Sequence, residues 1–316
     1  MDSPTVLPLP ALAWCLLPEL GLILAEGPEA RSFLQGQLSN DMASVSATQS
    51  QLSGYCSAKG RLLAVFTVQQ LGAEQFGLSL PLSLLPATLK RLKMFVLRSK
   101  LTLSDASALR PALALLGNEA PAQLSAFGLP APVTAWKSTS LNDVSVLRRP
   151  GDTPRFLLHV SPERLVELQS QLAKLAPPDE QAWALSELFA GLPLVLPATA
   201  DHYVPQTANL DLAGGVSFAK GCYPGQEIVA RVHYLGRLKQ RLHLSFAATA
   251  AEPGTSVFVA DGNGQAVGEV MAAATMPNGS SALSLVLQLA HSNSPDLRLG
   301  SSQGPALQAP MLYQNP

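Results

Sequence analysis

One short stretch, residues 219–231, holds a thiol, an ammonium, a phenol, an amide, a carboxylate and a guanidinium. Two glycines and a proline among them predict that the backbone turns sharply around Cys222. Pro224 suits the first turn of a helix, which the pattern predicts over residues 226–234. A thiol that lies just before a helix N-terminus is stabilised as the reactive thiolate. We therefore single out Cys222 as a candidate catalytic nucleophile, with Lys220 as a positive charge beside it.

Each of these residues also has an ordinary structural explanation. A lone cysteine is more often a small buried hydrophobe than a reactive group. A Gly/Pro turn between a lysine and a Gln-Glu pair is a rare place for a core cysteine, and this favours a functional Cys222. Glu227 suits the first turn of a helix and can pair with Arg231 four residues on. Alternatively, its carboxylate can accept two bonds from a flat ligand with adjacent ring N–H and amino donors.

Residues 220–227, Lys-Gly-Cys-Tyr-Pro-Gly-Gln-Glu, resemble the K-G-C-Y-x-G-Q-E signature of the YgfZ family. Members of this family are folate-binding proteins related to the glycine-cleavage T-protein and to mitochondrial iron–sulfur assembly factors. The resemblance extends to residues 204–210 and 214–218, and residues 33–41 resemble the family's L-Q-G-Q segment. These segments cover the ends of the common core, while the middle and the C-terminal third match only in pattern.

The resemblance implies an α+β fold with three T-protein-like lobes around a central channel that holds folate. It places residues 1–50 and 190–240 in one folate-binding lobe that carries the signature, and residues 51–189 in a second, α+β lobe. Residues 241–316 would form a small C-terminal β-barrel. The pattern of residues agrees with this in outline, because strands and an amphipathic helix precede residue 105 and short strands separated by turns follow residue 239.

The resemblance also implies roles for single residues. Glu227 matches the position whose carboxylate holds the pterin of folate. Trp183 matches a tryptophan implicated in folate contact, although a buried core tryptophan is the ordinary interpretation. A second family tryptophan falls near Leu20 in this chain, so that contact is lost or replaced by apolar packing. The remaining candidates for binding folate, by the same resemblance, are Tyr223, Gln226 and Arg231.

The sequence departs from the pattern of the related transferases after the turn formed by Lys59 and Gly60. Aminomethyltransferases place aspartates shortly beyond this glycine, where they steer methylene transfer at the folate nitrogens. Ala64 and Val65 stand there in this chain, and neither side chain can hold charge or shuttle a proton. We therefore expect no aminomethyl transfer by that mechanism and leave open whether the protein is an enzyme.

The composition limits the classes of partner. The chain has 316 residues, of which 14% are charged, and a net charge of −1. Such a chain lacks the overall basic character of a nucleic-acid-binding protein, so we expect no direct nucleic-acid partner. One local basic cluster remains, for which a solvated helix end and strand face is an equally good explanation. It consists of Arg231, His233, Arg237, Lys239, Arg241 and His243.

The cysteines and the N-terminal segment indicate the compartment. Cys15, Cys56 and Cys222 form no CxxC pair, which argues against a disulfide framework or a zinc site and predicts a reducing environment. An iron–sulfur cluster normally takes four thiolates, so we expect no metal held permanently by this chain. Prolines and a glutamate interrupt the apolar residues 7–25, and no Lys or Arg precedes Arg31. We expect no membrane span, no secretory signal and a cytoplasmic protein.

Our leading hypothesis is that the protein is a folate-dependent accessory factor. By resemblance it binds tetrahydrofolate or a derivative, and Cys222 supports the assembly or repair of iron–sulfur enzymes, including those that modify tRNA. Its partners would be those enzymes or their assembly factors, and we expect a monomer. Two alternatives stay open: a folate-dependent one-carbon transferase with Cys222 as nucleophile, and a folate-binding module in which Cys222 is structural.

Overall fold

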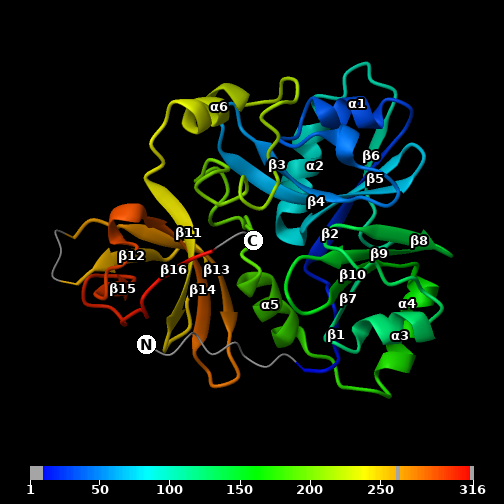
Figure 1. Ribbon diagram of the computed structural model, residues 1–316. Helices are drawn as coiled ribbons and strands as arrows, with labels where there is room; N and C mark the ends of the chain where they lie inside the picture. Colours follow the sequence, from blue (N-terminus) through cyan, green and yellow to red (C-terminus); the bar gives the residue numbers. More distant parts are fainter. Residues whose placement is uncertain (1–9, 261–263, 314–316) are drawn as a thin grey trace.

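Three β-sheets organise the computed structural model, which describes residues 10–260 and 264–313 (Figure 1). Two sheets have five strands and the third has six, and every pairing of strands within them is antiparallel. The helices are short and lie against or between the sheets (Figure 1). This arrangement confirms the α+β class that the sequence predicts.

The first sheet has the strand order β3-β4-β5-β2-β6 and carries the largest apolar core. Its core includes Ile23, Phe66 and Leu78, all fully buried. Its elements are β2 (Leu20–Glu26), β3 (Gln51–Cys56), β4 (Leu62–Gly72), β5 (Gln75–Pro81) and β6 (Thr102–Asp105), with α1 (Ala30–Gln35), α2 (Leu85–Lys93) and the 3-10 turns η1 (Met42–Ser44) and η2 (Leu82–Leu84).

The second sheet, in the order β1-β7-β10-β9-β8, is apolar on both faces. Alternation along β7 turns Leu113 and Leu115 toward a cluster with α3 and α4, while Ala112 and Ala114 face a cluster that contains Trp183 of α5. Its elements are β1 (Ala13–Leu16), β7 (Ala112–Leu116), β8 (Ser138–Leu141), β9 (Val144–Arg149), β10 (Arg155–His159), α3 (Ala120–Ala126), α4 (Pro162–Leu172) and α5 (Glu180–Phe189).

The third sheet, in the order β15-β12-β13-β14-β11-β16, curls into a half-barrel at the C-terminal end of the chain (Figure 1). This is the small barrel-like unit that the resemblance implied, and α6 precedes it in the chain. Its elements are β11 (Gln240–Ala247), β12 (Ser256–Val259), β13 (Gly268–Thr275), β14 (Ser281–Gln288), β15 (Leu297–Leu299), β16 (Met311–Leu312), the 3-10 turn η3 (Leu289–His291) and, before them, α6 (Gln226–Tyr234).

Buried polar contacts join the first two sheets and α5. Glu187 of α5 bridges the guanidinium groups of Arg149 and Arg155, and Arg149 Nη1 also donates to Thr67 Oγ1 of β4 at 2.7 Å. Burial lowers the pKa of Arg155 to about 10, although Glu187 opposes this. For Glu187, burial raises the pKa, but the charges of Arg149 and Arg155 outweigh it and the net shift is downward. These charges are paired as buried charges must be.

The strand pairing crosses one of the lobe boundaries that we expected. β2 pairs with β5, so residues on either side of position 50 share the first sheet. β1 pairs instead with β7 of the second sheet, which gives the N-terminal segment a strand in each of two sheets. The division into lobes at residues 50, 190 and 240 therefore stays a prediction, whereas the three sheets are structural units of the protein.

The turn before α6 docks against the tip of the hairpin between β3 and β4. Gly225 has φ +78°, and a Cβ atom added there would lie 2.4 Å from the carbonyl oxygen of Ser57 and 2.5 Å from the Cα atom of Gly60. Gly60 is equally enclosed, because its own Cβ would meet Ile228 Cβ at 2.8 Å. Only glycine permits both the left-handed conformation and this close approach.

We expect Gly225→Ala to destabilise the protein by about 1–3 kcal/mol, because a side chain there is strained and collides with backbone. The matched control is Gly221→Ala in the same loop, where an added Cβ meets nothing within 4 Å and the change should be near neutral. Thermal unfolding followed by circular dichroism compares the two variants. Equal melting temperatures would show that the docked turn contributes nothing.

Candidate functional site

Lys220 fixes the signature loop to the end of α1. Its side chain is 8% exposed, and its ammonium donates to the carbonyl oxygens of Gln35 and Leu38, each at 2.5 Å. Carbonyl groups at the C-terminal end of a helix lack partners within the helix and attract a cation. The two segments that carry the family resemblance, residues 33–41 and 220–227, therefore meet in space at this contact.

The ammonium of Lys220 also lies among negative groups and an aromatic ring. Burial lowers its pKa to about 8, while the charges of Asp41 and Cys222 act in the opposite direction. Its Nζ atom is 5.0 Å from the centroid of the Tyr223 ring. The role of this ammonium in activating the Cys222 thiol stays a prediction.

Cys222 is the accessible thiol among the three cysteines, all of which are free. The thiols of Cys15 and Cys56 are buried, and burial raises the pKa of each to about 12. The charges of Glu180 and Asp179 add to the effect at Cys15. A thiol reacts as its thiolate, so the two buried cysteines are inert and Cys222 is the candidate for chemistry.

Tyr223 and Gln226 shape the loop around Cys222. The ring of Tyr223 is 7% exposed and packs in the core of the first sheet. Burial raises the pKa of its phenol, and the charge of Cys56 adds to this, so the phenol stays protonated. The side-chain amide of Gln226 donates to the carbonyl oxygen of Lys220 at 3.4 Å and closes the turn. Their contact with folate stays a prediction.

Glu227 and Arg231 lie on the outer face of α6. The side chain of Glu227 is 84% exposed and that of Arg231 is 63% exposed, with 3.4 Å between Glu227 Oε1 and Arg231 Nη2. This is the helix pairing that the spacing of four residues allows, and an exposed pair of this kind contributes little stability. The role of Glu227 as the pterin carboxylate stays a prediction, which requires the ligand to reach this face.

Trp183 belongs to the buried cluster between α5 and the second sheet, and Leu20, which is partly buried, packs against this cluster. Trp183 is 7% exposed, and the guanidinium of Arg155 lies 5.6 Å from the centroid of its ring. Tyr223 belongs to the other cluster, in the core of the first sheet, and Trp136 packs against both. Contact of Trp183 and Leu20 with folate stays a prediction.

Trp136 and a group of amide side chains form a hollow that the sequence analysis missed. The hollow has a volume of about 260 Å³, and Gln51 in its wall has a buried side-chain nitrogen without a hydrogen-bond partner. Gln69 of β4 has both amide atoms buried and unpaired. The feature of the sequence that indicates this hollow is the run of polar residues 49–51 at the start of a strand. The lining residues are Asn40, Ser44, Gln49, Ser50, Gln51, Leu52, Trp136, Ala213 and Gly214.

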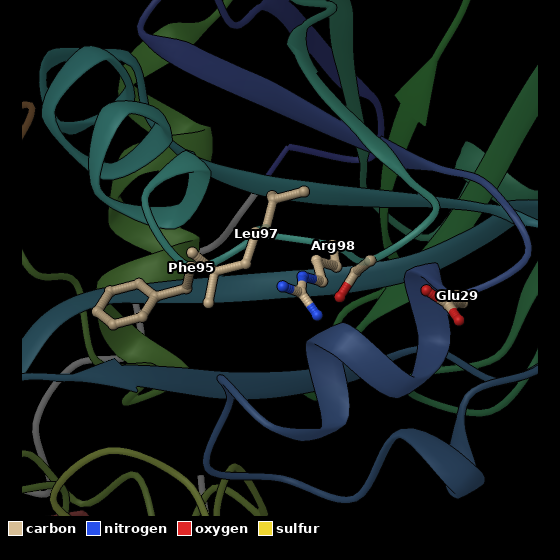
Figure 2. Close-up of a pocket in the computed structure, with 6 residues that line it drawn as sticks. Glu29, Phe95, Leu97 and Arg98 are labelled. Carbon is tan, nitrogen blue, oxygen red and sulfur yellow. The ribbon is translucent and has the colours of Figure 1, made fainter.

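A second hollow, of about 680 Å³, lies beyond the C-terminal end of α2 (Figure 2). Glu29 and residues 95–99 line it, and Figure 2 shows Phe95, Leu97 and Arg98 on the segment after α2, with Glu29 at the start of α1. None of the site residues predicted from the sequence lines this hollow. In residues 10–260 and 264–313, no three His, Cys, Asp or Glu side chains gather as they would to hold a metal ion. The same residues contain no helix whose length and apolarity would let it cross a membrane.

The sequence identity with curated relatives shows the family to which this chain belongs. A tRNA-modifying protein YgfZ from Colwellia psychrerythraea is 31% identical over 239 residues, which cover 76% of this chain and 73% of the relative. Proteins of the same name from Photorhabdus laumondii and Sodalis glossinidius are 34% and 32% identical and cover 76% and 88% of this chain, and 72% and 86% of their own lengths. The chain belongs to the YgfZ family. No family model matches it.

A solved structure places the fold of this YgfZ family member. The crystal structure of glycine cleavage system aminomethyltransferase T from Bartonella henselae superposes with a TM-score of 0.78, covering 96% of this chain and 85% of that one. The sequence identity is 18%, so the likeness concerns the fold alone. It confirms the T-protein-like fold that the resemblance implied. Ala64 and Val65 are both buried on β4, which puts no carboxylate at either position.

We expect a thiol reagent to modify Cys222 alone in the native protein, because Cys15 and Cys56 are buried and protonated at neutral pH. Mass spectrometry after brief treatment with iodoacetamide should find one adduct in the native chain and three in the unfolded chain. Native Cys222→Ala is the control and should take none. A native adduct on either buried cysteine would contradict this packing.

Lys220 should make the stability depend on pH. Its pKa is about 8 in the folded protein and 10.5 in the reference state, so between these pH values the unfolded chain binds more protons. The free energy of unfolding therefore rises with pH across this window, by up to about 1.4 kcal/mol per pH unit from this residue. Below pH 8 both states are protonated and the residue adds no slope.

Lys220→Met should remove that slope, whereas Lys59→Met, at an exposed hairpin position, should leave it in place. Urea unfolding at a series of pH values from 7 to 10 measures the difference between wild type and each variant. A constant difference between wild type and Lys220→Met across the series would show that the ammonium titrates as it does in water.

Proposed function

We propose that the protein is a folate-binding accessory factor of tRNA modification, which supports the assembly or repair of iron–sulfur enzymes through the thiol of Cys222. The observation that carries the proposal is the environment of this thiol: it is the exposed cysteine, lies in the family's signature loop and is coupled to the buried ammonium of Lys220. The curated relatives bear the name tRNA-modifying protein, which supports the role in tRNA modification.

The interior of the protein supports folate as the ligand. A pterin is a flat ring with an amide edge, and it needs aromatic or apolar faces and hydrogen-bonding groups along that edge. Trp183, Trp136 and Leu20 supply such faces, and the unpaired amides of Gln51 and Gln69 supply buried donors and acceptors. Buried amides of this kind normally pair with a bound molecule or with ordered water, and the edge of a pterin would satisfy them. When bound, tetrahydrofolate carries one-carbon units.

The residues on β4 argue against the one-carbon transferase. Ala64 and Val65 are buried and apolar, so neither can position or protonate a folate nitrogen. The remaining cysteines argue for a transient service to iron–sulfur enzymes, because Cys15 and Cys56 are buried and one exposed thiol cannot hold a cluster by itself. We place the protein in the cytoplasm as a monomer, with iron–sulfur enzymes or their assembly factors as partners.

The experiment combines folate binding with function in cells. Purified wild type and Cys222→Ala are titrated with tetrahydrofolate by isothermal calorimetry, and both are expressed in a bacterial strain that lacks its own family member. We expect both proteins to bind tetrahydrofolate, since neither the rings nor the unpaired amides that fit the pterin belong to the loop of Cys222. Wild type, but not Cys222→Ala, should restore growth under oxidative stress and the level of thiolated tRNA. Cys15→Ala, which changes a buried cysteine, is the matched control and should restore both.

The outcomes separate the alternatives. Complementation by Cys222→Ala would assign the cysteine a structural role and leave a folate-binding module. A covalent adduct on Cys222 after incubation with methylene-tetrahydrofolate would favour the transferase. Absence of tetrahydrofolate binding by wild type, with complementation intact, would remove folate from the proposal while keeping the thiol.

A further inference from the structure

The last residues of α6 and the segment that follows it carry exposed cations and rings, and we name this set of residues the α6 surface. Tyr234 is 66% exposed and Leu235 is 84% exposed. Aromatic side chains normally gain stability by burial, so an exposed ring at this place does not serve the core. The α6 surface consists of Arg231, His233, Tyr234, Leu235, Arg237 and Lys239, all of them exposed.

The rings of this surface are already stacked. Phe218, from the loop before Cys222, lies on His233 with 3.7 Å between the ring centroids and 12° between the ring planes. Tyr234 meets both rings edge-on, at 6.3 Å from Phe218 and 4.7 Å from His233. Such an arrangement fixes the side chains in advance, so a flat group that stacks on them costs little conformational entropy.

The cations of the surface lack partners of their own. Arg237 and Lys239 make no side-chain hydrogen bond or ion pair with the part of the chain that the structure describes. Arg231 has only the exposed, 3.4 Å contact with Glu227, which is easily exchanged for another anion. The surface therefore presents three cations against one carboxylate, although the whole chain has a net charge of −1.

We propose that the α6 surface binds a single-stranded segment of RNA. Cations contact the phosphates of such a strand, and its unstacked bases stack on exposed aromatic rings. An acidic protein would satisfy the cations but not the rings, so the combination favours RNA. The proposal reverses our expectation from net charge and goes beyond the proposed function, in which the protein serves enzymes. It makes the RNA that those enzymes modify a direct partner of this chain.

The test measures binding of the full-length protein to a fluorescein-labelled twelve-nucleotide polyuridine RNA by fluorescence anisotropy, at several salt concentrations. The double variant Arg237→Glu/Lys239→Glu should weaken binding more than tenfold and lower the salt slope by about 0.7 for each cation removed. Tyr234→Ala should weaken binding at least about fivefold without changing the slope, because it removes a stacking ring and no charge.

The matched control is Lys90→Glu/Lys93→Glu, which reverses two exposed cations at the end of α2. It should bind RNA like the wild type. Circular dichroism confirms that each variant folds, and Tyr234→Ala keeps the test decisive if the charge reversal disturbs α6. Cys222→Ala should bind RNA unchanged, which separates this surface from the thiol chemistry.

Three results would overturn the proposal. The first is a wild type that does not bind the RNA at 50 mM salt. The second is a control variant that loses as much affinity as the α6 variants, which would show non-specific attraction. The third is binding of polyglutamate, but not of RNA, with the same dependence on Arg237 and Lys239, which would assign the surface to an acidic protein.

Discussion

The structure of the site depends on one buried cation held between carbonyl oxygens. Burial of an ammonium is costly, and Lys220 offsets the cost by satisfying Gln35 and Leu38 at the end of α1. The same joint is reinforced by Ser39 and Asn40, whose side chains donate to the carbonyl oxygens of Gly215 and Gly214, each at 2.7 Å. The loop that carries Cys222 is thereby positioned by residues from the opposite end of the chain.

This joint brings together the two segments that carry the family resemblance, residues 33–41 and 220–227. The thiol is exposed, but the residues on either side of it are not: Lys220 and Tyr223 are buried, and Gly225 is pressed against the β3–β4 hairpin. A rigid support beneath a reactive group fixes its position and leaves only the group itself free to meet a partner. The Cys222 side chain is therefore exposed on a loop whose backbone is held in place.

Local patterns in the sequence were sufficient for some elements and not for others. The proline and glycine before α6, with charged residues four apart, predict the helix over residues 226–234, and the structure has it with the same bounds. The hairpin around Lys59 and Gly60 follows from its turn residues in the same way. The contact between Lys220 and α1 joins residues far apart in the chain, and no local pattern encodes it.

The candidate site shows the same limit. The resemblance located Trp183 and Leu20, and their common environment was deducible only from the fold, because the second sheet and α5 create it. The pairing of Arg149 and Arg155 with Glu187 was hidden, since each residue alone looks like an ordinary surface charge. Trp136 and Gln69 carry no motif at all. Burial without partners, which marks Gln69, is a property of the fold and not of the sequence.

The pairing of β1 with β7 has a consequence for biosynthesis. β1 is synthesised before β7, the strand that pairs with it, and all strands of the first sheet are made between the two. Until then Trp14 and Cys15, both buried at the end, are exposed on the nascent chain. Strands whose pairing partner has not yet been synthesised are prone to aggregation, and chaperones bind such exposed apolar segments. Folding of the second sheet therefore has to wait for synthesis of β7, while the first sheet can form without it.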